Sequence, residues 1–424
     1  MSLEMEGETW PLLVDNPGLS LPFAALCIVD LFGVFPIVAL PSPVIDCGWG
    51  GIPLALVVFG LQVYTAILLG RCWIIAECID PRIVSKNRYP YSALVEMSFG
   101  AWASVFVTVM LDVAVFGGGV PNLVIASQNL ELLGLRLGGS SIDVSYCYTL
   151  VGLGMVLCPI MWLGSPKDMK WVTTLSVASV VGVAVSTWTC MLLDHSPTTP
   201  AASISNPSLE TFAITYGILA FQFDIHPMVL TIQVDMRNKQ DLGCAIMIGF
   251  IVTGGLFLVT TGIAALQYGQ ATRLNVLQGL PPSILLFVDV LLVTLQICLS
   301  MVVGASAMFQ EIEDRIGVPR DFNWRRCATR TGLTLFTVLI GEAVPRVDIV
   351  MSLVGGALTG PLMFVFPPLL YARCRQMQGA APLSRFEAGL LVSVVLLGIA
   401  ATCSATFYSL RDAVRYAQFS PSCL

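Results

Sequence analysis

The stretch from Ala220 to Met236 reads AFQFDIHPMVLTIQVDM, and it decides how the whole chain is interpreted. It lies in an apolar run long enough to cross a membrane, yet Asp224, His226 and Pro227 fall within one helical turn. The proline removes a backbone hydrogen-bond donor and disfavours α geometry at the residue before it. Ionisable side chains at the centre of a bilayer cost about 2.5–3.5 kcal/mol on insertion scales, so they usually face a bundle interior or a water-filled path. The stretch therefore predicts an interrupted membrane helix with polar groups at the interruption.

The composition supports a membrane protein. Of the 424 residues, 56% are hydrophobic and 11% are charged, whereas soluble domains carry about 25% charged residues. The connections between apolar runs are short, which predicts one integral domain without a soluble catalytic module. The sequence has no basic stripe of the kind that binds nucleic acid, so no nucleic-acid partner is expected. The 13 cysteines show no metal-ligand spacing, so neither a metal nor a cofactor is expected.

The apolar runs predict an all-α polytopic membrane protein with about eleven transmembrane helices. Each run is long enough to cross a hydrocarbon core of about 30 Å. The expected spans are 20–46, 49–76, 101–133, 144–163, 170–193, 210–232, 242–268, 283–310, 327–342, 346–371 and 386–410.

The basic residues predict the orientation of these spans. With a cytosolic N-terminus, 16 of the 21 Lys and Arg residues fall on the cytosolic side and five on the opposite side. Cytosolic loops of membrane proteins carry such an excess of positive charge. We therefore expect the N-terminus in the cytosol and the C-terminus outside the cell or in a lumen.

A second interruption is expected in the first span, where DLFGVFPIVALPSP runs from Asp30 to Pro43. Paired broken helices in corresponding positions of two halves are the best sequence pointer to the binding site of a secondary transporter. Freed N–H groups suit a carboxylate, and freed carbonyls suit an ammonium group or a metal cation. An amino acid zwitterion satisfies both. The alternative is a pair of proline kinks in a packed bundle.

The expected site residues follow from these two interruptions and from the other acids inside spans. The substrate-binding candidates are Gly33, Val34, Phe35, Pro36, Phe223, Asp224, Ile225 and His226. The candidates for holding a coupling ion are Asp224, His226, Asp112, Asp289 and Asp30, and Asn122 or Ser127 are expected further out on the third span. For each acid, the alternative is a protonated carboxyl hydrogen-bonded to a neighbouring helix.

Asp224 with His226 forms the expected proton-coupling pair, because both groups can change protonation state when buried. Sodium is the alternative coupling ion, held by carbonyls near Gly33 and by hydroxyls of the eighth span such as Ser300.

Several motifs together resemble the amino acid/auxin permease family, and within it the vesicular inhibitory amino acid and vacuolar amino acid transporters. The likeness covers nearly the whole chain after residue 18. The motifs are FPIVALPSPVIDCGWGGIPLALVVFGLQVYTAILLGRC (35–72), YSALVEMSFG (91–100), GGGVPNLVIASQNL (117–130), AFQFDIHPMVLTIQVDM (220–236) and VPRVDIVMSLVGGALTGPLMFVFPPLLY (344–371).

The resemblance implies a LeuT-like bundle of five plus five helices in inverted repeats, with broken helices 1 and 6. It implies inverted repeats at about 20–193 and 210–371, an extra helix at 386–410, and a transporter domain spanning 19–424 after a tail of residues 1–18. The implied activity is amino acid transport by alternating access, linked to protons, with the lipid bilayer as partner.

The chain departs from the family pattern at the interruptions. Val34 and Pro36 stand where many members have glycine, Ile225 replaces the glycine of the sixth helix, and Asp224 stands where a small residue is usual. Leu230 and Thr231 take the places of a proline and a glutamate. Larger side chains narrow the expected cavity, and Asp224 adds a charge. The residues therefore indicate the family more firmly than the substrate, and cationic or unusual amino acids stay among the expected substrates.

The N-terminal tail contains ETWPLL, from Glu8 to Leu13. An acid followed by a pair of leucines resembles a sorting signal read by clathrin adaptors, here formed by Glu8, Leu12 and Leu13. We therefore expect a lysosomal, lysosome-related or vesicular membrane, with the plasma membrane as the second choice.

A non-transporting amino acid sensor is the main rival, because it would share the fold and the site. An enzyme is not expected, because only two histidines exist and no nucleophile or metal set converges within the spans.

Overall fold

The computed structural model describes residues 18–86, 89–137, 146–162, 169–195, 207–319, 322–344 and 346–416, and these form helices without a β-strand. Eight helical segments are long and apolar enough to cross a membrane. Two shorter apolar helices, α1 (Leu21–Phe32) and α7 (Tyr146–Trp162), and the helix α13 (Trp324–Ala343) fall at the three other expected spans. The predicted all-α bundle is confirmed.

The helices of the first half follow the expected spans closely. After α1 come α2 (Phe35–Val38), α3 (Pro41–Asp46), α4 (Gly51–Ile79), α5 (Pro90–Phe99), α6 (Ala101–Leu137), α7 and α8 (Met169–Leu192). The first span is thus three short helices, because Gly33 and the prolines at 36, 41 and 43 prevent a continuous one.

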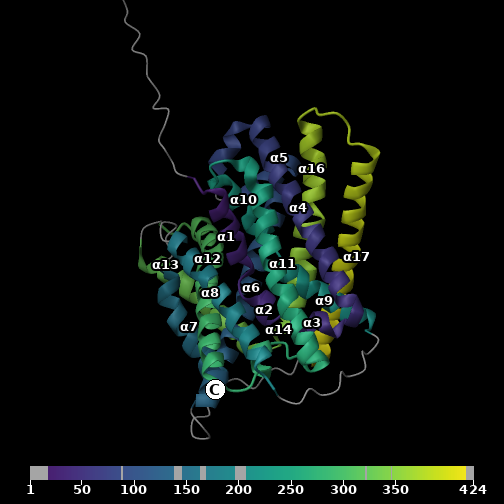
Figure 1. Cartoon of the computed structure of the whole chain (residues 1–424). Coiled ribbons are helices and arrows are strands. Elements are labelled where there is room, and N and C mark those ends of the chain that lie inside the picture. The colour runs from purple at the N-terminus through teal and green to yellow at the C-terminus, as the bar shows by residue number, and fades with distance from the viewer. Residues whose placement is uncertain are drawn as a thin grey trace, which may run out of the picture.

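The second half repeats this arrangement with a broken first span. Its helices are α9 (Leu209–Gln222), α10 (His226–Asp235), α11 (Leu242–Gln267), α12 (Ile284–Arg315), α13, α14 (Val347–Val354), α15 (Gly360–Phe364), α16 (Phe366–Met377) and α17 (Arg385–Tyr416). Figure 1 shows α7, α8, α12 and α13 gathered on one side of the bundle and α4, α16 and α17 on the other.

Polar clamps hold the α7, α8, α12, α13 side together. Asp289 of α12 is fully buried, and its two carboxyl oxygens lie 2.6 Å from Oγ of Ser186 and 2.7 Å from Oγ1 of Thr187 on α8. Arg330 of α13, also buried, donates to both carboxylate oxygens of Glu313 on α12 at 2.6 and 3.1 Å. These contacts make this side a rigid support for the helices that are broken.

Glycines allow α9 to approach the tenth span at backbone distance. A Cβ on Gly355 would lie 1.8 Å from the carbonyl oxygen of Gly217, and one on Gly217 would lie 2.5 Å from the carbonyl oxygen of Ser352. Small residues permit such close packing between membrane helices. The tenth span is itself interrupted by a π-helical segment, Gly355–Thr359, which separates α14 from α15.

Two features of the fold differ from the sequence expectation. The connection between the second and third spans contains the helix α5, which is too short and too weakly apolar to stand out as a span. The tenth span, expected as one helix over 346–371, consists of α14, the π-helical segment, α15 and α16.

Candidate functional site

The first break lies between α1 and α2, at Gly33 and Val34. Gly33 has φ +59° and ψ −146°, a backbone region essentially restricted to glycine. The Val34 amide donates to Oε1 of Gln296 on α12 at 3.3 Å. A Cβ on Gly33 would lie 2.9 Å from Nε2 of the same glutamine. The glycine therefore supplies both the backbone angle and the room that Gln296 needs to hold the break open.

The second break lies between α9 and α10, and Asp224 organises it. Oδ1 of Asp224 accepts a hydrogen bond from the His226 amide at 3.0 Å and lies 3.4 Å from Nδ1 of the same imidazole. Pro227 sits in the first turn of α10, where a missing N–H is tolerated. On its other side, Nε2 of His226 is 3.1 Å from Oγ1 of Thr65 on α4. The aspartate thus satisfies an amide in the first turn of α10 and lies beside the imidazole of the histidine.

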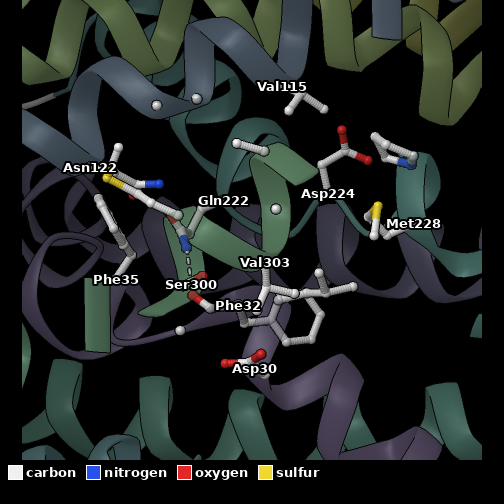
Figure 2. Close-up of a pocket in the computed structure, with 18 of the residues that line it drawn as sticks. Asp30, Phe32, Phe35, Val115, Asn122, Gln222, Asp224, Met228, Ser300 and Val303 are labelled. Carbon is white, nitrogen blue, oxygen red and sulfur yellow. Dashed lines mark hydrogen bonds between the residues drawn. The ribbon is translucent and has the colours of Figure 1, made fainter. Parts of the chain in front are cut away.

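The two breaks face each other across a direct contact. Nε2 of Gln222, the last residue of α9, donates to the carbonyl oxygen of Phe32, the last residue of α1, at 2.9 Å (Figure 2). The rings of Phe32 and Phe223 meet edge to face with centroids 5.6 Å apart, and the ring of Phe32 meets that of Phe250 at 4.9 Å. A carbonyl freed by the first break is therefore satisfied by the second, and aromatic packing fixes their spacing.

A cavity of about 180 Å³ lies against both breaks. Its volume is below the roughly 300–1,000 Å³ of pockets for drug-sized ligands, so it suits a small solute. The helices α1, α6, α9, α10 and α12 contribute to its wall, and Gly118 and Gly119 leave the α6 side open. Its polar wall residues are Asp30, Asn122, Gln222, Asp224, Gln296, Ser300 and Thr359.

The cavity is acidic. Asp30 and Asp224 both line it, at two separate edges in Figure 2, and no Lys or Arg is among its described lining residues. Oδ1 of Asp30 is buried and has no hydrogen-bond partner within the described part of the chain. An unpartnered buried carboxyl oxygen is costly unless a proton, a cation or a donor group completes it. The site therefore favours a proton, a cation or a hydrogen-bond donor beside Asp30.

The expected substrate-binding residues divide into two layers. Gly33, Phe35 and Asp224 line the cavity, as does Asp30 from the coupling set. Behind them lie the remaining five, all buried: Val34, Pro36, Phe223, Ile225 and His226. The second layer shapes the breaks, and His226 reaches the cavity through Asp224.

The other expected residues of the third and eighth spans lie in three places. Asn122 and Ser300 line the cavity, whereas Ser127 donates to the Leu123 carbonyl of its own helix at 2.7 Å. Asp289 forms the clamp on α8 described above. Asp112 lines a separate cavity of about 50 Å³ together with Glu311.

That smaller cavity adjoins the central one. Val115, Pro227 and Met228 line both, so these three side chains form the partition between them. Towards the opposite end of the bundle, a hollow of about 520 Å³ is lined by Asp46, Glu210 and other residues that the central cavity does not share. The described chain thus has a central chamber with a thin wall on the side where α10 ends.

Sequence reasoning missed the amides of Gln222 and Gln296 and the hydroxyl of Thr65. All three are polar groups inside apolar spans, which is a usable signal, but helical spacing alone does not say which neighbour each one meets. Gln296 is more than 250 residues from Val34 along the chain, and its hydrogen bond to the Val34 amide depends on the folded bundle.

A bundle of this kind, with two facing helix breaks around a small polar chamber, defines the LeuT-like class of membrane transporters. In agreement, the fold matches the crystal structure of MhsT in complex with L-phenylalanine with a TM-score of 0.56, over 91% of this chain and 98% of that one, at 13% identity. The expected LeuT-like fold is confirmed.

The family of this chain follows from its sequence. The profile of the family described as "Transmembrane amino acid transporter protein" matches residues 23–407, and the chain belongs to that family. The resemblance noted from the motifs is thereby confirmed.

Curated relatives of the chain carry names in keeping with this family. Amino acid transporter AVT1B of Arabidopsis thaliana is 26% identical over 352 residues, which cover 79% of this chain and 61% of that protein. Amino acid transporter AVT1J of the same plant is 21% identical over 413 residues, covering 94% and 92%. The chain spans about three fifths of the length of AVT1B.

Proposed function

We propose that the protein is a secondary active transporter that moves amino acids across a membrane by alternating access, coupled to protons. The observation that carries this proposal is the 180 Å³ chamber between two helix breaks, with two carboxyl groups in its wall. Helix ends at a break leave polar backbone groups that are tolerated at membrane depth only where they line a cavity. Asn122 and Ser300 offer hydrogen-bond donors to a carboxylate, and Asp30 offers an acceptor to an ammonium group, so the wall matches the two charged ends of a zwitterion.

Proton coupling is supported by the hydrogen bonds around His226. Oγ1 of Thr65 lies 3.0 Å from the Leu61 carbonyl oxygen and 3.1 Å from Nε2 of His226, and its single proton serves only one of them at a time. When Thr65 donates to Nε2, a neutral imidazole presents Nδ1–H to Asp224. When Thr65 donates to Leu61, Nε2 carries a proton, and the Nδ1–Asp224 contact then needs one more proton. The two arrangements differ by one proton, which is what a coupling site requires.

The acidity of the chamber favours amino acids with a positively charged side chain. Asp224 is tied to His226, whereas Oδ1 of Asp30 has no partner among the described residues and can receive an ammonium or guanidinium group. Charge-assisted hydrogen bonds of that kind are shorter and stronger than neutral ones.

Sodium coupling is the second candidate. Asp30 and Ser300 line the same chamber beside the broken end of α1, and carboxylate, hydroxyl and carbonyl oxygens are the ligands that hard cations take. A sensor without a transport cycle is the third, because the chamber alone would serve it.

Purified full-length protein in proteoliposomes separates these candidates. We expect an imposed pH gradient to drive uptake of labelled amino acids equally well in sodium and in choline buffer. A protonophore should abolish this uptake. Uptake that needs sodium and ignores the pH gradient would select the second candidate. Saturable binding without counterflow of labelled substrate would select the sensor.

The orientation and the compartment are parts of the same proposal. We propose a cytosolic N-terminus, a lumenal or extracellular C-terminus, and a lysosomal, lysosome-related or vesicular membrane. The signal at Glu8, Leu12 and Leu13 lies outside the described residues. Combined Leu12→Ala and Leu13→Ala substitution in a tagged protein is expected to shift it to the plasma membrane, and an unchanged intracellular pattern would remove the signal from the account.

A further inference from the structure

A large cavity outside the transport chamber lies at the end of the bundle where α1 begins and α10 ends. Its volume is about 570 Å³, and its wall comes from α4, the end of α10, the start of α11 and α16 with the residues that follow it. Figure 1 places the ends of α10 and α16 on this face of the bundle. The cavity shares no lining residue with the chamber between the breaks, so the proposed transport function does not use it.

The polar wall of this cavity is basic. Arg71, Lys239 and Arg375 line it, and no Asp or Glu is among the described lining residues. Lys239 pairs with Glu77 outside the lining. Arg71 has no ion pair or hydrogen bond to any described residue. The guanidinium groups of Arg71 and Arg375 therefore line the same cavity, and no carboxylate in its described wall neutralises their charge.

The guanidinium of Arg375 is only partly used. One of its terminal nitrogens donates to the Ala381 carbonyl oxygen at 2.9 Å, while Nε is buried and has no hydrogen-bond partner within the described chain. A buried N–H without an acceptor costs free energy that a bound anion recovers.

The α4 side of the wall is apolar, whereas Gln233, Gln240, Gln378 and Tyr371 add uncharged polar groups elsewhere. Ile67, Ile74 and Ile75 of α4 line the cavity. On α11, just beyond the cavity residue Gly243, the side chains of Met247 and Ile251 are exposed on the outer surface of the bundle. A molecule seated here would meet cations at one end and an apolar helix surface at the other.

We propose that this cavity binds the headgroup of an anionic lipid carrying a phosphomonoester, with its acyl chains along α4 and α11. A phosphomonoester brings about −1.5 to −2 charges and three acceptor oxygens, which matches two guanidinium groups that form no ion pair with a described residue and a lysine shared with Glu77. Basic pockets between transmembrane helices on the cytoplasmic side are suited to such headgroups. Glu387, an exposed acid outside the wall that interacts electrostatically with Arg375 and Arg71, accepts a hydrogen bond from the Ser384 amide at the start of α17. Its attraction to the two arginines is weakened by water and salt because it is exposed.

The test uses purified full-length protein in neutral detergent and a fluorescent dioctanoyl phosphatidylinositol phosphate, with binding followed by anisotropy. We expect saturable binding that unlabelled probe displaces and that dioctanoyl phosphatidylcholine does not. Soluble inositol phosphate and inorganic phosphate should displace the probe at least about tenfold less well, because they lack the tails. Equal displacement by inorganic phosphate would overturn the lipid assignment.

Charge-removing variants locate the site. Arg71→Gln and Arg375→Gln are each expected to raise the Kd about fivefold, the weight of one basic residue near a membrane surface. Arg82→Gln is the matched control, because Arg82 is 94% exposed at the same end of the bundle and lies outside the cavity wall. Its Kd should stay within about twofold of the wild-type value. The same weakening in all three variants, or none in the first two with unchanged melting temperatures, would overturn the proposal.

Discussion

Replacing Gly33 with alanine tests the first helix break in the most direct way. At φ +59° and ψ −146°, any residue with a Cβ is strained, by about 1–3 kcal/mol. The new Cβ would lie 2.9 Å from Nε2 and 3.1 Å from Oε1 of Gln296, so the amide must move away. The hydrogen bond from the Val34 amide to that oxygen is then weakened or lost, which costs about 1 kcal/mol more.

The sum is about 2–4 kcal/mol against the observed break geometry, which corresponds to roughly 30- to 700-fold in its population. Amino acid uptake at low substrate concentration in proteoliposomes should fall by at least about 30-fold. Gly60→Ala is the matched control, because Gly60 lies within the regular helix α4 and a Cβ there meets nothing within 4 Å. Its uptake should equal that of the wild type. Uptake by folded Gly33→Ala protein within about twofold of wild type would refute the reasoning that the break forms the substrate site.

Three other substitutions test separate parts of the structure. Asp224→Asn removes the carboxylate beside His226. The variant should still exchange labelled substrate in counterflow, but a pH gradient should no longer accelerate its uptake of substrate. Gradient-driven uptake at the wild-type rate would contradict the coupling role. Arg330→Gln leaves Glu313 with only the more distant Arg326, whose Nε lies 3.9 Å from Oε1, so the unfolding free energy should fall by up to about 3–5 kcal/mol. The melting temperature in detergent should therefore be lower, and an unchanged melting temperature would contradict the buried pair. Gly355→Ala places a Cβ 1.8 Å from the Gly217 carbonyl, so folded protein should be recovered in much lower yield, and a wild-type elution profile would show that the close packing is dispensable.

The fold could be predicted largely from local signals. Apolar run length is a one-dimensional property, and it located the eight long spans because each must cross the same hydrocarbon thickness. The two breaks were also predictable, because Gly33 and Pro227 act on the backbone of their own helices. The helix α5 was not, because a ten-residue helix beside a membrane carries no length signature.

The site could be predicted only in part, for a physical reason. Sequence identifies which residues lie at a break, but the side on which each one faces depends on helix rotation in the folded bundle. Asp224 and Phe35 line the chamber, whereas their neighbours Ile225 and Val34 are buried behind it. The partners of Asp289 were equally out of reach, because Ser186 and Thr187 lie about one hundred residues away on another helix.

The tenth span shows a further limit. Its glycines were visible in the sequence, but the π-helical turn at Gly355–Thr359 lies where α9 approaches, and the Gly217 carbonyl would meet any side chain at Gly355. Such a turn depends on a contact between distant segments and has no local pattern of its own.

One measurement tests the central account most directly: uptake of a panel of labelled amino acids, basic ones included, by wild-type protein in sodium-free proteoliposomes with an imposed pH gradient and a pH-sensitive dye on the inside. A site between facing breaks with a proton-binding Asp224–His226 pair predicts saturable uptake of at least one amino acid, proton movement that rises with it, and loss of both when a protonophore is added. Substrate entry without any accompanying proton flux, or no entry of any amino acid into vesicles that contain folded protein, would contradict it.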